Sequence, residues 1–398
     1  MSETVHIPQL RFPEFSGDWN RVKIQKLLDD KSIISHLDGN HGALYPRSEE
    51  FTKEGVPYVT ANDFINGKVD LKKCKCLPVE RASQFKKGIA HNGDVLFAHN
   101  ATVGPVALLE TDLEYVVLST TATYYRCDNN TLINKYLKVY LTSNDFVRQY
   151  SRVMSQSTRN QVPITTQRLF YINLPDKPEQ QKIAAFLTAV DSKIEQLSKK
   201  QELLGEYKKG LMQQIFSQAI RFKADDGSEF PDWEEKKLRD VAKITTGSSN
   251  REDSGLDGQY TFFDRSEDIR TSDRYLFDGK AVIVAGEGSR FPPKYFEGKF
   301  DLHQRTYAIM EFVEANSKYI FYFVDKQKNY LLRYAVGSTV KSLRLPIFQK
   351  MPVSLPSLPE QTKIANFLSS IDNKIEQVGG QLDKSKQFKN ALLQQMFV

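Results

Sequence analysis

The chain has 398 residues, 40% of them apolar, and a formal net charge of +6 at pH 7. This length exceeds the size at which one hydrophobic core keeps growing, so two or more domains are expected. No apolar run approaches the ~20 residues that span a bilayer, and the first residues do not resemble a secretory signal, so we expect a cytoplasmic protein. The three cysteines lack paired zinc-ligand spacing and are expected to be reduced and structural. The small basic excess is compatible with a polyanionic partner but does not identify one.

Residues 1–175 are predicted to form the first domain. They contain short runs of Val, Ile, Tyr and Phe interrupted by Gly, Asn and Asp, which is typical of a mixed α/β domain. The domain opens with Arg11-Phe12, followed by Trp19.

Residues 176–218 are predicted to form a long helix. Pro178 suits the first turn because it lacks the N–H that would be unpaired there, and Glu179 faces the positive end of the helix dipole. Apolar residues then alternate four and three positions apart from Ile183 to Ile215, which is a heptad pattern. At 1.5 Å per residue the helix would be about 58 Å long.

Residues 219–356 open like the first domain, with Arg221-Phe222 followed by Trp233, and are predicted to form a second α/β domain. Residues 357–398 then repeat the helix. The segments Leu174–Phe216 and Leu355–Phe397 align without gaps, 181 residues apart, and are identical at 20 of 43 positions. A long unit that occurs twice indicates internal duplication and not a solenoid.

Both helices carry the heptad pattern in the same slots, so we expect them to pack along each other. Lys208 and Lys389 share one slot, and polar seam residues of this kind commonly fix register or orientation. Gly379 and Gly380 each weaken the second helix by roughly 1 kcal/mol relative to Ala, so it is expected to need its partner. The predicted fold is two mixed α/β domains separated by two long antiparallel helices that form an intramolecular coiled coil with pseudo-twofold symmetry.

Three motifs carry a resemblance to a known family. They are Leu-Pro-x-x-Pro-Glu-Gln-x-Lys-Ile-Ala before both heptad patterns, Gly55–Asp63 (Gly-Val-Pro-Tyr-Val-Thr-Ala-Asn-Asp) and Gly93–Gly104 (Gly-Asp-Val-Leu-Phe-Ala-His-Asn-Ala-Thr-Val-Gly). On these residues the chain resembles the specificity subunit of type I restriction-modification systems, over essentially its whole length. The second domain's counterpart, Gly279–Ser289, keeps the glycine and the apolar strand but departs from Asn-x-Thr-Val-Gly.

This resemblance implies that residues 1–175 and 219–356 are target-recognition domains, each reading one half of a bipartite double-stranded DNA target. The helices would act as a ruler across an unread spacer and as a docking platform for two modification subunits. Those subunits carry S-adenosylmethionine, and motor-nuclease subunits using ATP and Mg complete the complex. The chain itself would hold no cofactor, metal or catalytic residue. Candidate contacts for the modification subunits are the outward faces around Glu179, Gln180, Glu360 and Gln361, although helix capping explains the glutamates equally well.

Some residues of the sequence suggest other functions. Pro175-Asp176 followed by Asp191-Ser-Lys193 superficially matches a metal-dependent nuclease, but the second copy has Pro356-Ser357. Asp191 and Lys193 also lie about 200° apart around a helix, so they do not converge on a metal. No phosphate-binding loop, zinc-protease or dinucleotide-binding motif is present in the sequence. A coiled-coil adaptor whose two domains bind proteins is the competing function.

DNA contacts are expected on polar loops, because base edges are read by Arg, Lys, Asn and Gln and phosphates mainly by Arg and Lys. The first domain offers Thr60, Asn62, Asn100, Thr102 and the run Ser157–Gln161, which contains Arg159, Asn160 and Gln161. The second offers Arg290, Lys294, His303 to Arg305, and the run Ser338–Arg344, which contains Lys341 and Arg344. The runs 156–161 and 337–342 occupy matching positions in the two repeats. His99 is more readily interpreted as a hydrogen-bonded loop histidine than as a DNA contact.

Overall fold

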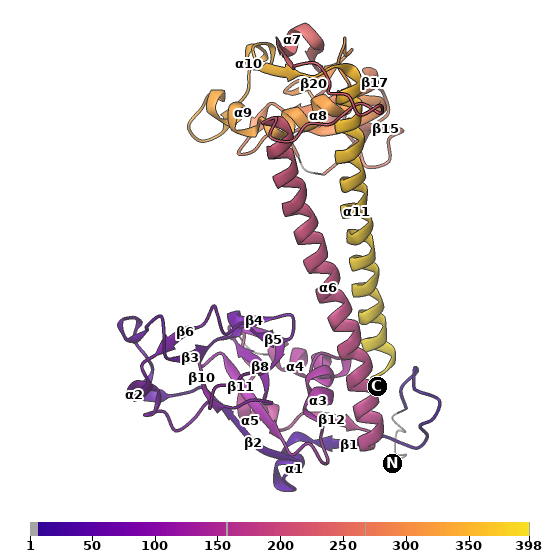
Figure 1. The fold of residues 1–398 in the computed structure, drawn as a ribbon. Coiled ribbons are helices and arrows are strands. Elements are labelled where there is room, and N and C mark those ends of the chain that lie inside the picture. Colours follow the sequence, from indigo (N-terminus) through magenta and orange to yellow (C-terminus); the bar gives the residue numbers. More distant parts are fainter. Residues whose placement is uncertain (1–6, 157, 267, 398) are drawn as a thin grey trace. The chain divides into compact units, whose positions relative to one another are not determined.

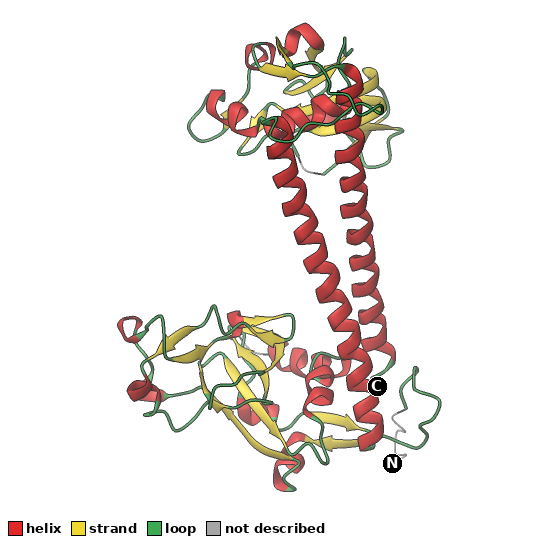
Figure 2. Ribbon diagram, in the orientation of Figure 1, coloured by secondary structure: helices red, strands yellow, loops and turns green. Residues whose placement is uncertain are grey.

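The computed structural model describes residues 7–156, 158–266 and 268–397. It divides into two compact units, Met1–Lys199 with Gly380–Val398, and Lys200–Gly379. Each unit contains one mixed α/β domain and one end of each of two long helices, α6 (Lys177–Phe216) and α11 (Leu358–Gln395) (Figure 1, Figure 2). Helix starts were predicted near Pro178 and Pro359, and both helices begin one residue earlier.

The first unit's domain is built mainly on β-sheets. Its largest sheet has the order β2-β11-β8-β9-β5-β4, formed by β2 (Ile33–Asp38), β4 (Phe64–Ile65), β5 (Lys68–Val69), β8 (Val95–Asn100), β9 (Thr102–Leu108) and β11 (Ala122–Cys127). A second sheet, β6-β3-β10-β7, contains β3 (Val56–Val59), β6 (Lys75–Leu77), β7 (Ile89–Ala90) and β10 (Val116–Leu118). A further antiparallel pair joins β1 (Asn20–Lys23) to β12 (Tyr171–Leu174). Its helices are α1 (Ile24–Asp29), α2 (Val79–Ala82), α3 (Asn134–Tyr140), α4 (Asn144–Ser155) and α5 (Ile164–Gln167), with 3₁₀ turns η1 (Gly42–Leu44), η2 (Ser48–Glu50) and η3 (Ala61–Asp63).

The first unit's main core joins the domain to the helix ends. Strand β8 is buried over Val95–Ala98 because both faces of the sheet are covered here, with Val95 and Phe97 in one apolar cluster and Leu96 in another. Phe97 on this strand belongs to one cluster with Leu187 of α6 and Phe397, which follows α11. Full burial of such side chains contributes roughly 1.5–3 kcal/mol each. The helix ends are therefore part of this domain's core.

The second unit repeats this plan with a smaller domain. Its largest sheet has the order β14-β20-β17-β19-β15-β16, formed by β14 (Lys243–Thr246), β15 (Tyr260–Phe263), β16 (Arg270–Ser272), β17 (Phe277–Ala285), β19 (Lys294–Leu302) and β20 (Thr306–Met310). Two short antiparallel pairs join β13 (Glu234–Lys237) to β22 (Pro352–Leu355), and β18 (Glu287–Gly288) to β21 (Lys341–Ser342). Its helices are α7 (Leu238–Val241), α8 (Ser317–Lys326), α9 (Lys328–Tyr334) and α10 (Leu345–Gln349), with the 3₁₀ turn η4 (Arg251–Asp253).

The second unit's core is organised in the same way. Tyr319 of α8 and Val353 of β22 share a buried cluster with Ile215 of α6 and Ile364 and Leu368 of α11. Among the residues described for this unit, no counterpart of the β6-β3-β10-β7 sheet is present. The duplication therefore preserved the junction between domain and helices while the rest of the domain changed.

An ion pair joins the two helices in each unit. Lys389 Nζ lies 2.6 Å from Asp191 Oδ1 in the first, and Lys208 Nζ lies 2.5 Å from Asp372 Oδ1 in the second. From the first ion pair to the second, the residue number rises from 191 to 208 on α6 and falls from 389 to 372 on α11. The two helices are therefore antiparallel, as predicted. The lysines at the shared heptad slot were predicted to fix register, and each contacts an aspartate on the opposite helix.

Gly379 of α11 leaves space for the side chain of Gln201 on α6. A Cβ atom at this position would come within 2.8 Å of the Gln201 side-chain nitrogen, closer than real contacts of this kind. Gln201 occupies a heptad slot of α6, so the glycine accommodates a polar residue in the seam. Helix α11 continues through both glycines, as expected if its partner helix supports it.

The glutamate in the first turn of each long helix is buried and binds the start of its own domain. Glu179 accepts from Arg11 Nε and Nη2, both at 2.7 Å, and from Trp19 Nε1 at 3.2 Å. In the second unit Glu360 accepts from the corresponding arginine and tryptophan, with distances of 2.9 Å from Arg221 Nη2 and 3.1 Å from Trp233 Nε1. These contacts explain why both domains open with the same Arg-Phe and Trp residues.

The neighbouring glutamines close the same junctions. Gln180 accepts from the Ile133 amide at 2.9 Å and donates to the carbonyls of Thr131 and Pro175. Gln361 accepts from the Asn316 amide at 2.7 Å and donates to the carbonyls of Glu314 and Pro356.

All four of these side chains are buried: Glu179, Gln180, Glu360 and Gln361. The expectation that they lie on outward faces is therefore wrong, because the arginine, the tryptophan and the loop before the domain's central helix enclose them. A partner that docks on the repeats would have to bind neighbouring exposed residues.

The cysteines Cys74, Cys76 and Cys127 are free thiols, as the sequence predicted. Burial raises the pKa of each thiol. They are therefore protonated and unreactive near neutral pH.

Candidate nucleic-acid interface

In the first domain the predicted loops meet at the turn between β8 and β9. Ala101 forms the tip of this turn with a left-handed φ of 62°. Its amide donates to the Asn160 carbonyl at 3.0 Å, and Asn160 Nδ2 donates back to the Ala101 carbonyl at 2.7 Å. The turn therefore lies beside the loop that precedes α5. This places Asn100 and Thr102 next to Asn160 and Gln161.

The predicted segment that contains Thr60 and Asn62 lies at the same surface. Thr60 donates through its amide and its hydroxyl to Asp63 Oδ2, both at 2.8 Å, and so caps the turn η3. The Ala61 amide donates to Thr121 Oγ1 at 2.9 Å, while Asn100 Nδ2 donates to the Thr120 carbonyl at 3.4 Å. The loop 119–121 thus connects the two predicted segments.

The exposures of these side chains differ. Asn62, Thr102, Arg159 and Asn160 are exposed, whereas Thr60, Asn100 and Gln161 are half-buried. Thr60 therefore acts first as a structural cap of this surface. The run predicted as Ser157–Gln161 is described from residue 158 onward, and Ser157 lies outside the described residues.

His99 supports this surface from inside. It is buried, and its Nδ1 lies 3.2 Å from the Val162 carbonyl. Burial lowers the pKa of His99, so the ring is neutral at pH 7. The predicted hydrogen bond of His99 is confirmed, but the predicted loop position is wrong, because β8 continues to Asn100 and includes His99.

The second domain brings its predicted loops together through β18 and β21. Glu287 pairs with Ser342, and Gly288 pairs with Lys341. The loop after β17, which leads to Arg290, therefore lies beside the loop before α10, which ends at Arg344. Arg290 and Arg344 are exposed, and Lys341 is half-buried.

Lys294 and Arg305 were both predicted to contact DNA, and the structure gives them different partners. Lys294 Nζ donates to the Ser266 carbonyl at 2.9 Å and lies over the Phe263 ring. Arg305 is exposed, and its Nη1 donates to Glu287 Oε1 at 2.8 Å. Lys294 therefore also buttresses the loop after β15.

Equivalent backbone hydrogen bonds define the same frame in both domains. In each domain the end of the hairpin strand (β8 or β17) is joined to the loop before the short helix (α5 or α10) and to the loop before β11 or β20. That last loop is also joined to the end of β3 or β15. In the first domain the hydrogen bonds run from Val162 N to His99 O, from His99 N to Thr121 O and from Ser119 N to Val59 O. In the second domain they run, in the same order, from Leu343 N to Gly286 O, from Gly286 N to Arg305 O and from His303 N to Phe263 O. All six distances lie between 2.7 and 3.0 Å. Thr121 therefore corresponds to Arg305, Asn100 to Glu287 and Ala61 to Arg265.

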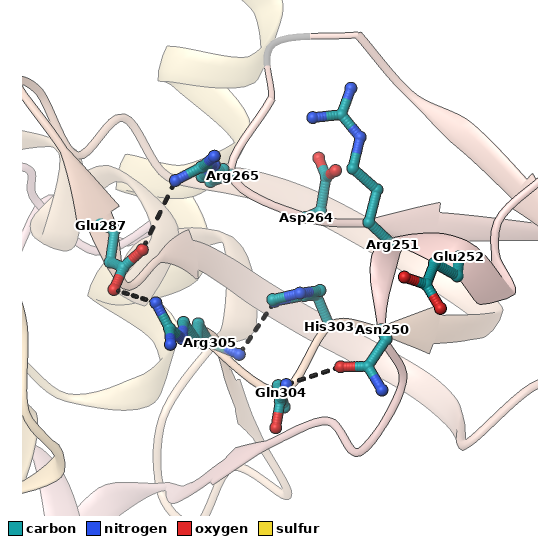
Figure 3. Close-up of a pocket in the computed structure, with 9 residues that line it drawn as sticks. All are labelled: Asn250, Arg251, Glu252, Asp264, Arg265, Glu287, His303, Gln304 and Arg305. Atoms are coloured by element: carbon teal, nitrogen blue, oxygen red, sulfur yellow. Dashed lines mark hydrogen bonds and ion pairs between the residues drawn. The ribbon is translucent and has the colours of Figure 1, made fainter.

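The frame of the second domain encloses a cavity of about 490 Å³ (Figure 3). It is lined by Asn250, Arg251, Glu252, Asp264, Arg265, Glu287, His303, Gln304 and Arg305. Glu287 lies between two guanidinium groups, with Arg305 Nη1 at 2.8 Å and Arg265 Nη1 at 3.6 Å. Guanidinium and carboxylate groups therefore line one cavity.

Two ionisable groups in this cavity have shifted pKa values. Burial lowers the pKa of His303, and the nearby Arg305 and Arg265 lower it further, against the effect of Asp264. Burial acts to raise the pKa of Asp264, but hydrogen bonds from the Ser266 hydroxyl and amide outweigh it and leave the pKa below its usual value. At pH 7 the histidine is neutral and the aspartate is ionised.

Sequence reasoning missed Asn250, Arg251 and Arg265. A signal for Arg265 was available, because it lies in the polar stretch after the apolar strand ending at Phe263, as Asn62 lies in the polar stretch after the strand ending at Val59. Asn250 and Arg251 follow the strand β14 after a glycine-serine turn. The polar residues after these strands belong to the same surface as the predicted ones.

One of the residues that suggested a nuclease, Asp191, is explained by its ion pairs. Asp191 binds Lys389 and lies 3.9 Å from Lys138, so its charge is used inside the first unit. Within residues 7–156, 158–266 and 268–397, no group of three or more His, Cys, Asp or Glu side chains is arranged to hold a metal ion. Nor does any helix in this described part have the length and apolar character needed to cross a membrane.

Comparison with known proteins agrees with this architecture. The family model for the type I restriction modification DNA specificity domain matches residues 34–204 and 231–384. A putative type I restriction enzyme MjaX specificity subunit from Methanocaldococcus jannaschii is 24% identical over 388 residues, covering 91% of this chain and 89% of that protein. The EcoDI specificity subunit from Escherichia coli is 31% identical over 166 residues, covering 41% of this chain and 37% of that protein.

Solved structures share the fold. The S subunit of a type I restriction-modification system from M. genitalium matches with a TM-score of 0.63 and 14% identity, covering 98% of this chain and 99% of that one. Because the two matches to the family model cover most of the chain and fall on both domains, the chain belongs to the type I restriction-modification DNA specificity family, as a specificity subunit with two target-recognition domains.

Proposed function

We propose that each target-recognition domain binds double-stranded DNA and reads one half of a bipartite target, separated by a spacer that is not read. The observation that carries this proposal is the shared backbone frame, which presents different side chains in the two domains. The first domain presents Asn62, Arg159 and Asn160, while the second presents Arg265 and Arg305 at frame positions where the first has no arginine. One scaffold with two sets of base-reading groups is suited to two different half-sites.

The two helical repeats serve in this proposal as a ruler and as a docking platform for two modification subunits. Support comes from the duplication, because the same buried glutamate junction and the same lysine-aspartate pair occur in each unit. Equivalent surfaces bind equivalent partners. Because α6 and α11 are continuous helices, a length change in both would alter the distance between half-sites.

The chain is proposed to catalyse nothing by itself. Methyl transfer would use S-adenosylmethionine bound by the modification subunits, and cleavage would use ATP and Mg in motor-nuclease subunits. A restriction system acts on DNA in the cytoplasm, which is where we place this chain. The isolated chain is then expected to show no methyl transfer when supplied with S-adenosylmethionine.

The test combines DNA binding with methylation mapping. The assembled complex is titrated with DNA at two salt concentrations, and log affinity should fall with log salt in proportion to the phosphates contacted. Single-molecule sequencing of methylated DNA from cells carrying the complex then gives the motif. Exchange of residues 1–175 for the first domain of another family member should change one half of that motif and leave the other intact. Salt-independent binding, or an adaptor without DNA affinity, would contradict the proposal.

A further inference from the structure

The cavity of the second domain carries a recognition group that the first domain lacks. Arg305 and Arg265 both contact Glu287 through Nη1, and the side chain of Glu287 is 18% exposed against 64% and 63% for the arginines. A guanidinium group has five donors, so a contact through Nη1 leaves the edge formed by Nε and Nη2 for a two-point contact. The carboxylate also restricts two long, flexible side chains before any ligand arrives.

The first domain has no guanidinium group at the equivalent positions. Thr121 replaces Arg305, and its hydroxyl is occupied inside the frame by the Ala61 amide at 2.9 Å and the Ser119 hydroxyl at 2.6 Å. Ala61 replaces Arg265 and is buried. Asn100 takes the place of Glu287. The charged cluster is therefore specific to the second domain.

The charges in the cavity favour a base pair over a phosphate. Glu252, Asp264 and Glu287 line the same cavity as the arginines, and carboxylates repel a phosphate group. The major-groove edge of a G·C pair presents acceptors at guanine O6 and N7 and a donor at cytosine N4. Arginine donors beside carboxylate acceptors complement that edge, and a cluster of arginines alone would not discriminate in this way.

We propose that this cavity reads a G·C base pair in the half-site of the second domain, with Arg305 donating to guanine O6 and N7. Glu287 is a positioning residue that orients Arg305 and the neighbouring Arg265. This inference rests on the proposed function, because it requires that the second domain read a half-site. At the equivalent position of the first half-site, the neutral frame makes no arginine contact with guanine.

The test is Arg305→Lys in the assembled complex. Lysine keeps the charge but loses the planar fork that makes two hydrogen bonds to guanine. The methylated motif should lose its preference for guanine at one position of the second half-site, by roughly 5- to 150-fold, the factor expected of a bidentate pair. Nonspecific affinity and its salt dependence should stay unchanged because the charge is retained.

Two further variants separate the roles. Glu287→Gln removes the charge that orients the arginines and should relax discrimination at that same base pair. Arg239→Lys is the matched control, because Arg239 is exposed on α7, pairs with Asp240 and does not line the cavity. An unchanged first half-site in every variant shows that the complex has folded and assembled.

The outcomes distinguish the two proposals. A wild-type complex without a bipartite motif would contradict the proposed function itself. A bipartite motif that Arg305→Lys leaves unchanged, or a second half-site without a G·C pair, would overturn the inference while leaving the proposed function standing. An unchanged motif in Arg305→Lys, together with lower nonspecific affinity and a smaller salt slope in Arg305→Ala, would show that Arg305 binds phosphate, and this also overturns the inference.

Discussion

Lys389 Nζ lies 2.6 Å from Asp191 Oδ1, and the residues 181 positions away in the sequence form the same ion pair, with Lys208 Nζ 2.5 Å from Asp372 Oδ1. The duplication thus placed one lysine and one aspartate on each helix and generated two interhelical pairs. The surroundings of the two aspartates differ. Asp372 also accepts from the Tyr322 hydroxyl at 2.6 Å, while Asp191 lies 3.9 Å from the cation of Lys138.

Exchanging the two charges of one ion pair should restore the thermal stability that a single charge change removes. Lys208→Glu places two carboxylates together and should lower the unfolding temperature, whereas Lys208→Glu with Asp372→Lys should recover most of it. The side chains are 19% and 36% exposed, so after allowance for solvent screening a coupling of about 1 kcal/mol is expected. Thermal unfolding of the four proteins of this double-mutant cycle measures it. Additive effects of the two changes would show that the pair does not fix the register.

The junction glutamates should matter more than any surface charge. Glu179→Ala leaves Arg11 and Trp19 without their acceptor in a buried site, and loss of one partner of a buried ion pair costs about 3–5 kcal/mol. Glu360→Ala should have a similar effect in the second unit. Glu195→Ala is the matched control, because Glu195 pairs with Lys68 and both side chains are 53% exposed. Denaturant unfolding measures the differences, and equal effects at Glu179 and Glu195 would contradict the prediction.

One of the buried histidines of the first domain, His36, should make stability depend on pH. Burial is the main cause that lowers the pKa of His36 to about 3, although Gln167 hydrogen-bonds to its ring. In the unfolded chain the pKa is about 6.5, so the unfolded state binds a proton that the folded state does not. Stability is therefore fully present above pH 6.5 and is lost as the pH falls towards 3.

This effect is measurable between pH 7 and pH 5, above the range in which most carboxylates titrate. There the free energy of unfolding should fall by up to about 1.4 kcal/mol per pH unit for this one group. His36→Gln keeps a donor towards Gln167 and should have a shallower slope. Identical slopes in the wild type and the variant would show that His36 does not cause the pH dependence.

The long helices could be predicted from the sequence because their signals are local and were present twice. The start at Pro178 and the heptad slots need no knowledge of distant residues. The burial of Glu179 could not be predicted in this way, since its partners Arg11 and Trp19 lie 168 and 160 residues earlier. In isolation a glutamate in a first turn is expected to be exposed.

The loops of the candidate interface in the first domain could also be predicted from local sequence patterns. The turn at Asn100 follows an apolar strand, and its contact with Asn160 supports the grouping of these loops. Arg265 was missed because its strand, which ends at Phe263, is not followed by the Thr-Ala-Asn-Asp residues that pointed to the loop after Val59 in the first domain. Its place beside Glu287 depends on strands that pair far apart in the chain, which no local pattern encodes.

A matched insertion in both helices tests whether they set the spacing of the half-sites. Seven residues added between Lys199 and Lys200 in α6, and between Gly380 and Gln381 in α11, preserve the heptad pattern and follow the register of the two ion pairs. Each helix lengthens by about 10.5 Å, which equals roughly three base pairs at 3.4 Å each. The unread spacer of the methylated motif should lengthen accordingly while both half-sites persist.

The control is an insertion of two residues at the same places. It rotates every following side chain by about 200° and moves the apolar residues out of the seam, so it should lower the unfolding temperature and abolish methylation. The seven-residue variant should instead fold and methylate DNA, because each lysine still meets its aspartate. If that variant is active and keeps the original spacer, the helices do not act as a ruler, and the reach of the loops around Asn160 and Arg305 must set the spacing instead.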